Sequence, residues 1–109
     1  MMPSIDQFFE FDIRIGKIVE VEDLEGARKP IYRLKVDLGE LGIKNIAAGI
    51  KSFYTKEELL GKSIAVIANL DPKSVAGFVS EGMILAADDG TNVCILTPEK
   101  ELPPGSRIR

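Results

Sequence analysis

The side chains of this chain that are equipped for chemistry are cations and amides, and the usual catalytic groups are missing. The sequence has no His, so the commonest general base is absent. Its one cysteine, Cys94, lies in the apolar segment Asn92–Leu96, where we expect a small buried core residue. No Walker-type phosphate loop and no cluster of metal ligands is present. The composition therefore predicts a protein that is not an enzyme and that uses no cofactor or metal.

The strongest binding pattern is a run of cations, Arg28, Lys29, Arg33 and Lys35, with no acidic residue among them. Apolar and polar residues alternate over residues 32–38, which predicts a half-buried strand whose outer face carries Arg33 and Lys35. Two residues apart on a strand, these side chains are spaced roughly 7 Å, which suits contacts with the phosphate and ribose groups of RNA. A single cation of this kind is usually only a solvated surface charge, whereas the cluster fits either role.

Two further cations, Lys51 and Lys73, fall in predicted loops and extend this patch. Asn69 interrupts an apolar strand, and a buried amide needs hydrogen-bond partners, so Asn69 either joins strands of the fold or faces a binding groove. Met83 is either a core residue or a flexible apolar platform for a base. Because the net charge is −3 and aromatic residues are few, we expect weak, shape-based binding to folded RNA that falls steeply with salt.

Short strands must position these residues, because the apolar pattern is mostly two-residue alternation. The only helix with clear end signals has Thr55 as its N-cap, Glu58 completing a capping box, Gly61 after its last residue, and a length of about two turns. The predicted strands are Phe11–Val21, Tyr32–Leu38, Ile43–Ala48, Lys62–Leu70, Met83–Ala87 and Asn92–Leu96. This order predicts an all-β, five-stranded OB-fold barrel with one short helix between strands 3 and 4.

Other local signals concern the first strand and the two ends of the chain. Ile18 departs from the phase of its apolar neighbours just after Gly16, which predicts a bulge or a sharp bend at the glycine. Residues 1–109 read as a single domain, with an N-terminal arm over residues 1–10 and a C-terminal extension over residues 98–109. No segment approaches the ~20 apolar residues of a membrane span. The N-terminus lacks the pattern of a signal peptide, so we expect a cytoplasmic protein.

Several segments together resemble a known family. They are Asp12–Val19, Tyr32–Gly39, Tyr54–Lys62, Ala68–Leu70, Ser80–Ala87 and Pro104–Ile108. In this order and spacing they are similar to the tRNA-binding OB-fold family, whose members occur as free dimers, as parts of aminoacyl-tRNA synthetases and as CsaA-type chaperones. Residues 27–32, 38–44 and 75–78 look like the CsaA type, whereas residues 47–50, 68–70 and 82–90 look like the C-terminal domain of methionyl-tRNA synthetases.

The resemblance implies a non-catalytic tRNA-binding module, either a free homodimer or a partner of a methionyl-tRNA synthetase catalytic subunit. The alternative is a CsaA-like, export-associated chaperone that binds unfolded peptides at a dimer groove. The resemblance also implies that Asn69, Ser80 and Met83 lie near the binding groove. The residues that it implies at a dimer interface are Ile5, Phe8, Phe9, Leu102 and Ile108, whose other possible role is to plug the barrel ends within one monomer.

Overall fold

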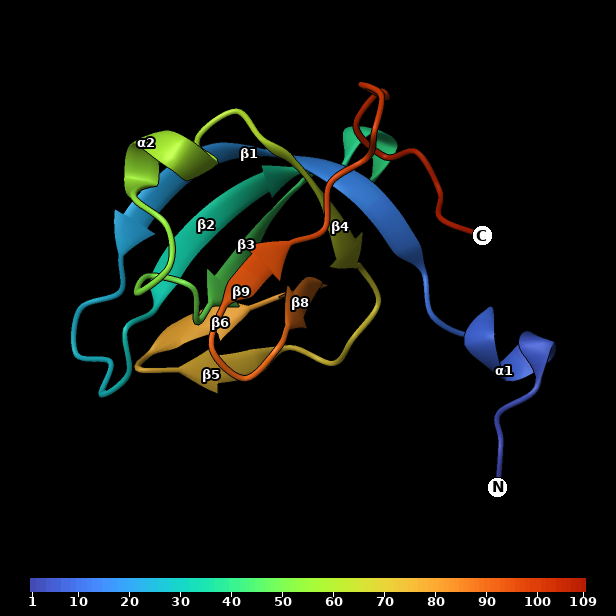
Figure 1. The fold of residues 1–109 in the computed structure, drawn as a ribbon, viewed down its shortest axis with the longest axis horizontal. Helices are drawn as coiled ribbons and strands as arrows, with labels where there is room; N and C mark the ends of the chain where they lie inside the picture. Colours follow the sequence, from blue (N-terminus) through green and yellow to red (C-terminus); the bar gives the residue numbers. More distant parts are fainter.

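The structure is a computed structural model that describes residues 1–109, and a curled sheet of five strands dominates it (Figure 1). All pairings in this sheet are antiparallel, and the strand order is β3-β2-β1-β4-β7. The strands are β1 (Ile13–Asp23), β2 (Tyr32–Asp37), β3 (Ile43–Ala48), β4 (Ser63–Ile67) and β7 (Met83–Ile84). The helix α2 (Lys56–Leu59) lies between β3 and β4. The predicted five-stranded OB-fold barrel with one helix between its third and fourth strands is therefore confirmed.

The barrel can close because the long strand β1 pairs with β4 along its first part and with β2 along its second part. Residues 13–17 of β1 pair with β4, and residues 17–23 pair with β2. The remaining gap lies between β3 and the end of β6 (Phe78–Ser80), with the residue that follows it. Here the backbone N–H of Ala47 donates to Ser80 Oγ at 2.9 Å. The N–H of Glu81 donates to the carbonyl of Asn45 at 2.7 Å, so side-chain and backbone bonds together complete the barrel wall.

The predicted bulge in the first strand exists, but at a different residue. The register of β1 against β2 shifts between Ile18 and Glu20, which makes Val19 the extra residue, and Val19 is 41% exposed. Gly16 is required for a separate reason. A Cβ atom at Gly16 would lie 2.4 Å from Cγ1 of Val36, so β1 and the β2 side chains approach too closely there for any side chain.

The core is formed where the inner faces of β1, β2, β3 and β4 meet. The alternation predicted for the second strand is confirmed, and β4 is buried on both faces. Fully buried side chains are those of Ile18, Leu34, Val36, Leu38, Ile46, Leu59, Ile64 and Val66. β4 ends at Ile67, so Asn69 lies beyond the strand rather than within it.

The helix α2 begins as predicted and is shorter than predicted. Thr55 Oγ1 accepts from the N–H of Glu58 at 3.2 Å, and Glu58 Oε1 accepts from the N–H of Thr55 at 2.8 Å, which is the capping box. The helix has four residues and ends at the predicted glycine: Gly61 follows the C-cap Leu60 at a φ of +85°. Beyond the helix, the N–H of Gly61 donates to the carbonyl of Ile18 in β1 at 2.8 Å.

Two small hairpins leave the barrel. The pair β5 (Lys73–Val75) and β6 turns through Ala76 and Gly77, both at positive φ, as a two-residue hairpin turn requires. Sequence reasoning missed this hairpin because its strands are short and Ala is an unusual residue at positive φ. The predicted later hairpin is confirmed as β8 (Ala86–Asp88) with β9 (Val93–Ile95).

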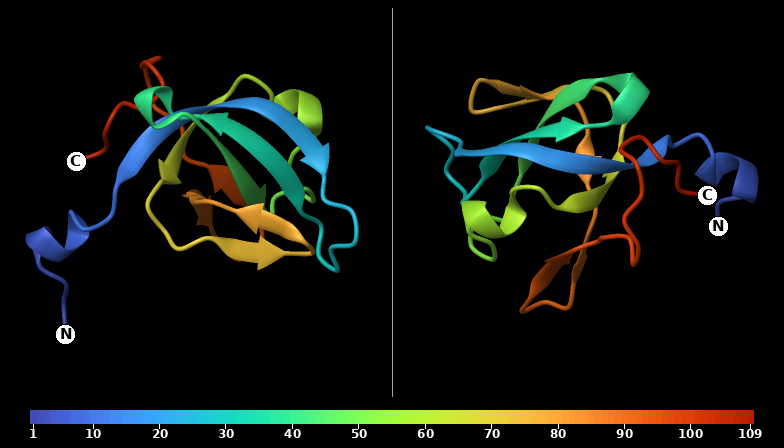
Figure 2. Two further views of the ribbon diagram at one scale, coloured as in Figure 1. Left: turned by 180° about the vertical axis from the view of Figure 1, so that it is seen from behind. Right: turned by 90° about the horizontal axis from the view of Figure 1, so that it is seen from above.

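Cys94 is exposed, so the expectation of a buried core residue is wrong. The β8–β9 hairpin projects away from the barrel, as Figure 2 shows from above. Only one of its faces meets the core, through Val93 and Ile95. Cys94 lies between those two residues on β9 and therefore faces the other way, toward solvent.

The two ends of the chain behave differently. The N-terminal arm carries the helix α1 (Ile5–Phe8), which stands apart from the barrel and has no buried residue (Figure 1). The C-terminal extension instead returns along β1, where Gly105 donates to Ile15 at 2.7 Å and Ile108 donates to Ile13 at 2.8 Å through backbone N–H groups. A short 3-10 turn, η1 (Gly39–Leu41), lies under this extension. No helix in the structure is long and apolar enough to span a membrane.

Candidate nucleic-acid interface

The outer face of β2 and β3 carries two rows of side chains that cross three strands. Register pairs Lys35 with Glu20 of β1 on one side and with Asn45 of β3 on the other. The neighbouring row pairs Arg33 with Glu22 and with Ala47. The loop 24–31 and the segment 68–82, which contains the β5–β6 hairpin, flank this face. Strands 2 and 3 with these two loops are where OB-fold barrels commonly bind oligonucleotides.

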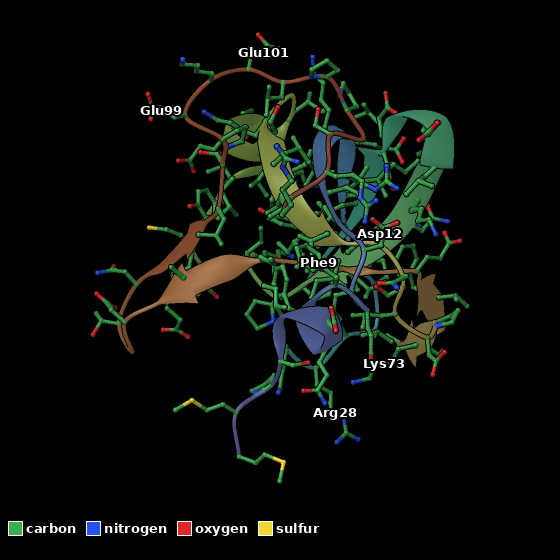
Figure 3. The ribbon with its side chains drawn as sticks, turned by 90° about the vertical axis from the view of Figure 1, so that its right-hand side faces the viewer. Phe9, Asp12, Arg28, Lys73, Glu99 and Glu101 are labelled. Carbon is green, nitrogen blue, oxygen red and sulfur yellow. The ribbon has the colours of Figure 1, made fainter.

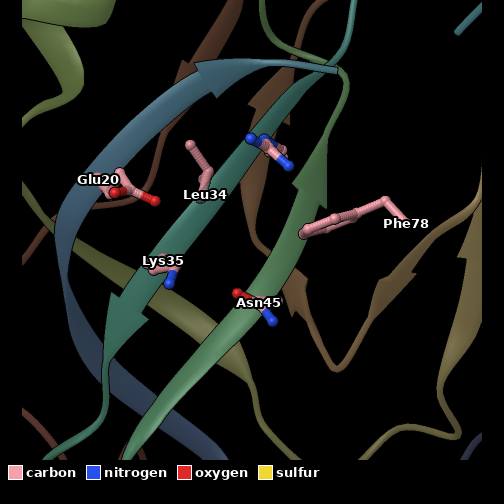
Figure 4. A pocket seen from close by; sticks show the side chains of 6 residues that line it. Glu20, Leu34, Lys35, Asn45 and Phe78 are labelled. Carbon is pink, nitrogen blue, oxygen red and sulfur yellow. The ribbon is translucent and has the colours of Figure 1, made fainter. Parts of the chain in front are cut away.

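The first hollow on this face has a volume of about 350 Å³ (Figure 4). Its walls come from β1, β2, β3 and β6. The lining residues are Glu20, Arg33, Leu34, Lys35, Asn45 and Phe78. In Figure 4 the Phe78 side chain extends from β6 toward β3, and Lys35 and Asn45 stand side by side on the neighbouring strands. We call this hollow the β2 pocket.

A second hollow, of about 270 Å³, lies farther along β3 beside the β5–β6 hairpin. We call it the β3 groove, and it is more apolar than the β2 pocket. Its lining residues are Ile31, Ala47, Gly49, Leu70, Asp71, Lys73, Val75, Ser80, Gly82 and Met83. The structure therefore brings the predicted residues Lys73, Ser80 and Met83 together at one place, next to the strand that also borders the β2 pocket.

The predicted cations on this face differ in whether they form an ion pair within the chain. Arg33 forms an ion pair with Glu22, and its Nε lies 3.1 Å from Glu22 Oε2. The hydrogen bond from Arg33 to the Glu22 carboxylate raises the pKa of Arg33 above its usual value. Lys35 forms no ion pair with the chain although it faces Glu20, so its ammonium group is available to a ligand.

The loop cations are also available. Arg28 and Lys29 are exposed in the loop 24–31, and Lys73 is exposed at the start of β5. None of the three takes part in an ion pair. Figure 3 shows Arg28 and Lys73 directed outward from the barrel. Lys73 was predicted in a turn and instead opens a strand.

Two predicted site residues, Ser80 and Met83, line the β3 groove. Ser80 is buried; its Oγ accepts from Ala47 N–H and donates to the carbonyl of Gly82 at 3.1 Å, so it holds the barrel closed. Met83 is 45% exposed, and the alternative that placed it in the core is wrong. Its thioether instead presents an apolar surface at the β3 groove.

Two other predicted residues lie away from this face. Lys51 forms an ion pair with Asp23 at 3.0 Å, and Lys56 shares the same carboxylate at 3.2 Å beside α2. Asn69 holds the N-terminal arm: its Oδ1 accepts from the N–H of Asp12 at 2.7 Å, and its Nδ2 donates to the carbonyl of Glu10 at 2.8 Å. Of its two predicted roles, the structure favours the joining one.

Sequence reasoning missed Glu20, Asn45 and Phe78 as members of the face. Asn45 was detectable, because it lies on the outward phase of the third strand, opposite Lys35. Phe78 was not detectable, because the hairpin that delivers it to this face was not predicted. Glu20 was not detectable either, because only the strand register makes it the cross-strand neighbour of Lys35.

The predicted dimer residues form no part of the barrel core. Ile5 is 68% exposed, Phe9 and Leu102 are each 45% exposed, and Phe8 contacts Phe9 edge to face. The exposure of the side chains of Ile5, Phe8, Phe9 and Leu102 does not fit the alternative role as plugs for the barrel ends. Ile108 is half-buried, in the extension that pairs with β1.

Comparison with models of known families identifies a match to the putative tRNA-binding domain over residues 13–107. This chain belongs to that family. The matched range of this tRNA-binding domain contains every strand of the barrel, the β2 pocket and the β3 groove. The family description is that of a binding domain.

Curated relatives of this tRNA-binding domain include much longer enzymes. Methionine–tRNA ligase of Thermococcus kodakarensis is 49% identical over 106 residues, which covers 97% of this chain and 14% of the enzyme. Methionine–tRNA ligase of Methanosarcina acetivorans is 48% identical over 111 residues, covering 99% of this chain and 15% of the enzyme. The domain thus spans only a small part of the length of these relatives.

Solved structures match the domain along its whole length. The chaperone CsaA of Bacillus anthracis superposes with a TM-score of 0.93 at 39% identity, and all of both chains is covered. A MetRS-related protein of Pyrococcus horikoshii superposes with a TM-score of 0.90 at 29% identity, covering 100% of this chain and 99% of that chain. The two subtypes seen as mixed motifs in the sequence thus both appear among the structural neighbours.

Proposed function

We propose that the chain is a non-catalytic tRNA-binding module that contacts tRNA through the outer face of β2 and β3. The observation that carries the proposal is that the unpaired cations Lys35 and Lys73 line two neighbouring hollows on this face. Arg28 and Lys29 in the flanking loop extend the same cationic surface. Family membership and the identity to methionine–tRNA ligases support tRNA as the nucleic acid.

The module binds folded tRNA mainly through phosphate and ribose contacts, as a surface with few aromatics must. Associated with a methionyl-tRNA synthetase catalytic subunit, it raises the local tRNA concentration for the enzyme, a gain that needs no new chemistry. It works in the cytoplasm with the tRNA-charging machinery.

The exposed apolar residues of the N-terminal arm and Leu102 support association into a homodimer. Replacement of Phe8 and Phe9 by Asp then yields a monomer in light scattering.

The test is direct binding of methionine tRNA at low salt, measured by fluorescence anisotropy. The double substitution Arg33→Ala with Lys35→Ala is expected to weaken binding by about tenfold, because two cations of the proposed RNA-facing surface are lost. Lys62→Ala with Lys100→Ala removes the same charge from exposed positions outside both hollows and is the matched control. Equal losses in the two variants, or none in either, contradict the placement of the site on β2 and β3.

The second candidate function is peptide binding of the CsaA kind. It is favoured by the superposition with CsaA over the full length of both chains and by the exposed apolar residues of the arm. Suppression of the aggregation of an unfolded client protein is the corresponding assay. Suppression that survives Arg33→Ala with Lys35→Ala and disappears with Phe8→Asp and Phe9→Asp would establish this function instead.

A further inference from the structure

The geometry points to recognition of a base within the proposed tRNA site: the β2 pocket binds one unpaired guanine base. This inference rests on the proposed function, because it describes what part of the tRNA the pocket contacts. It differs from phosphate binding, since the pocket contains a carboxylate, Glu20, which repels a phosphate group.

The polar groups of the pocket are complementary to a base edge. Glu20, Lys35 and Asn45 form one continuous row across β1, β2 and β3, on strands spaced about 4.8 Å apart. None of these three side chains forms a hydrogen bond or an ion pair within the chain. The row therefore presents an acceptor-only carboxylate, a donor-only ammonium and an amide that can do both.

The pocket also has a wall on which a base can stack. Phe78 extends into it from β6, and its ring is half-buried rather than fully covered (Figure 4). Unpaired bases of RNA are commonly stacked on aromatic side chains and hydrogen-bonded along their edges. The volume of about 350 Å³ is at the lower end of the range of small-ligand pockets, about 300–1,000 Å³.

Guanine is the base that matches the row. Its Watson–Crick edge has two adjacent donors, N1–H and the N2 amino group, which the Glu20 carboxylate accepts together. Its O6 is an acceptor for the Lys35 ammonium or the Asn45 amide. Adenine, cytosine and uracil each offer only one donor group on that edge, so a carboxylate beside them keeps unmatched charge. A site built for two N–H donors rejects bases that lack them.

The test uses small RNA hairpins that are identical except for one loop nucleotide: guanosine, inosine, adenosine or uridine. Wild-type protein is expected to bind the guanosine loop about tenfold more tightly than the adenosine or uridine loop, the discrimination typical of a bidentate pair. Inosine lacks only the N2 amino group, so its loop should bind with intermediate affinity.

Two charge-neutralising variants separate base recognition from general electrostatics. Glu20→Gln should abolish the guanosine preference and strengthen binding of the adenosine loop, because a negative charge near RNA is removed. Glu22→Gln removes the same charge from the next row and frees Arg33, so it should strengthen binding of all loops and keep the preference. Phe78→Leu should weaken all loops alike, since stacking is tolerant of sequence.

The outcomes distinguish the proposed tRNA function from the guanine specificity of the β2 pocket. Wild-type protein that binds neither tRNA nor any hairpin overturns the proposed function. Wild-type protein that binds tRNA but treats all loops equally, with Glu20→Gln behaving as Glu22→Gln, overturns the guanine pocket alone. Guanosine monophosphate that competes as well as the guanosine hairpin would overturn the assignment to tRNA in favour of a free nucleotide.

Discussion

At the scale of single residues, the partner across the strand decides what a charged side chain does. Arg33 and Lys35 project from the same face of β2, but Arg33 is held by Glu22 whereas Lys35 has no ion pair. The alternating pattern alone makes the two cations look equivalent. A cation that must leave a carboxylate before it meets a phosphate contributes less to binding than one that is free.

The pH dependence of the stability of the domain is centred on another single residue, Asp12. Its carboxylate accepts from Arg14 Nε at 2.7 Å and from Nη2 at 3.2 Å, and this contact holds the pKa of Asp12 below its usual value. Since the folded-state pKa is lowered, the contribution to stability is present above the unfolded-state pKa of about 3.9 and is lost as the pH falls through the folded value.

We therefore expect Asp12→Asn to be less stable than wild type at pH 7, with a difference that shrinks as the pH falls below about 4. Urea unfolding followed by circular dichroism at a series of pH values measures this. A difference that does not change with pH would contradict a stabilising role for the ionised carboxylate of Asp12.

At the scale of elements, contacts between neighbouring strands and helices explain residues whose roles the sequence pattern does not predict. Gly16 was predicted to bend β1, but its role is to let β1 lie against buried side chains of β2. The capping box of α2 was predictable because it is formed by residues three apart. The end of α2 at Gly61 was predictable as well, because a glycine at positive φ commonly follows the last helical residues. The hydrogen bond from the N–H of Gly61 to Ile18 was not predictable, since Ile18 belongs to a distant strand.

Gly16→Ala is expected to destabilise the domain by about 1–3 kcal/mol, because its Cβ would overlap Cγ1 of Val36 and Cδ2 of Leu38 in a full core. Thermal unfolding should show a lower Tm. Gly49→Ala is the matched control, since a Cβ there meets no atom within 4 Å, and its effect should stay within about 0.5 kcal/mol. Equal Tm values for the two variants would remove the packing argument.

The N-terminal arm is a second case at this scale. Two hydrogen bonds from the Asn69 side chain to the backbone of Glu10 and Asp12 fix where the arm leaves the barrel. Asn69→Ala should speed amide exchange at Asp12 and expose the arm to proteolysis, with little change in Tm. Asn69→Asp keeps the acceptor for the Asp12 N–H and should preserve protection at that amide. Unchanged protection in Asn69→Ala would show that α1 is held by something else.

At the scale of the whole molecule, the distribution of charged side chains disfavours general binding of polyanions. The net charge is −3, and acidic residues of β1 stand beside the basic face of β2. Binding of tRNA must therefore depend on a few local cations. Arg28, Lys29, Lys35 and Lys73 are the unpaired ones on or beside the proposed site.

The salt dependence of tRNA binding should reflect that small number. Three phosphate contacts, made by Arg28, Lys29 and Lys73 while Lys35 contacts the base, correspond to a slope of about −3 in a plot of log Kobs against log salt concentration. Lys73→Gln should reduce the magnitude of the slope by about 1. Lys62→Gln, outside both hollows, should leave it unchanged. Titrations between about 50 and 200 mM salt measure this. A slope near zero would contradict a phosphate-based interface.

The sequence by itself determined what short-range physics controls. The alternation over residues 32–38, the capping box at Thr55 and the order of strands around one helix all depend on near neighbours in the chain, and the structure confirms them. Only the tertiary structure decided which cations are paired, that Asn69 holds the arm, that Cys94 faces solvent and that Phe78 reaches the β2 pocket. Each of these depends on strand register or on the direction in which a hairpin leaves the barrel. Those features arise from contacts between residues far apart in the chain, which periodicity along the sequence does not encode.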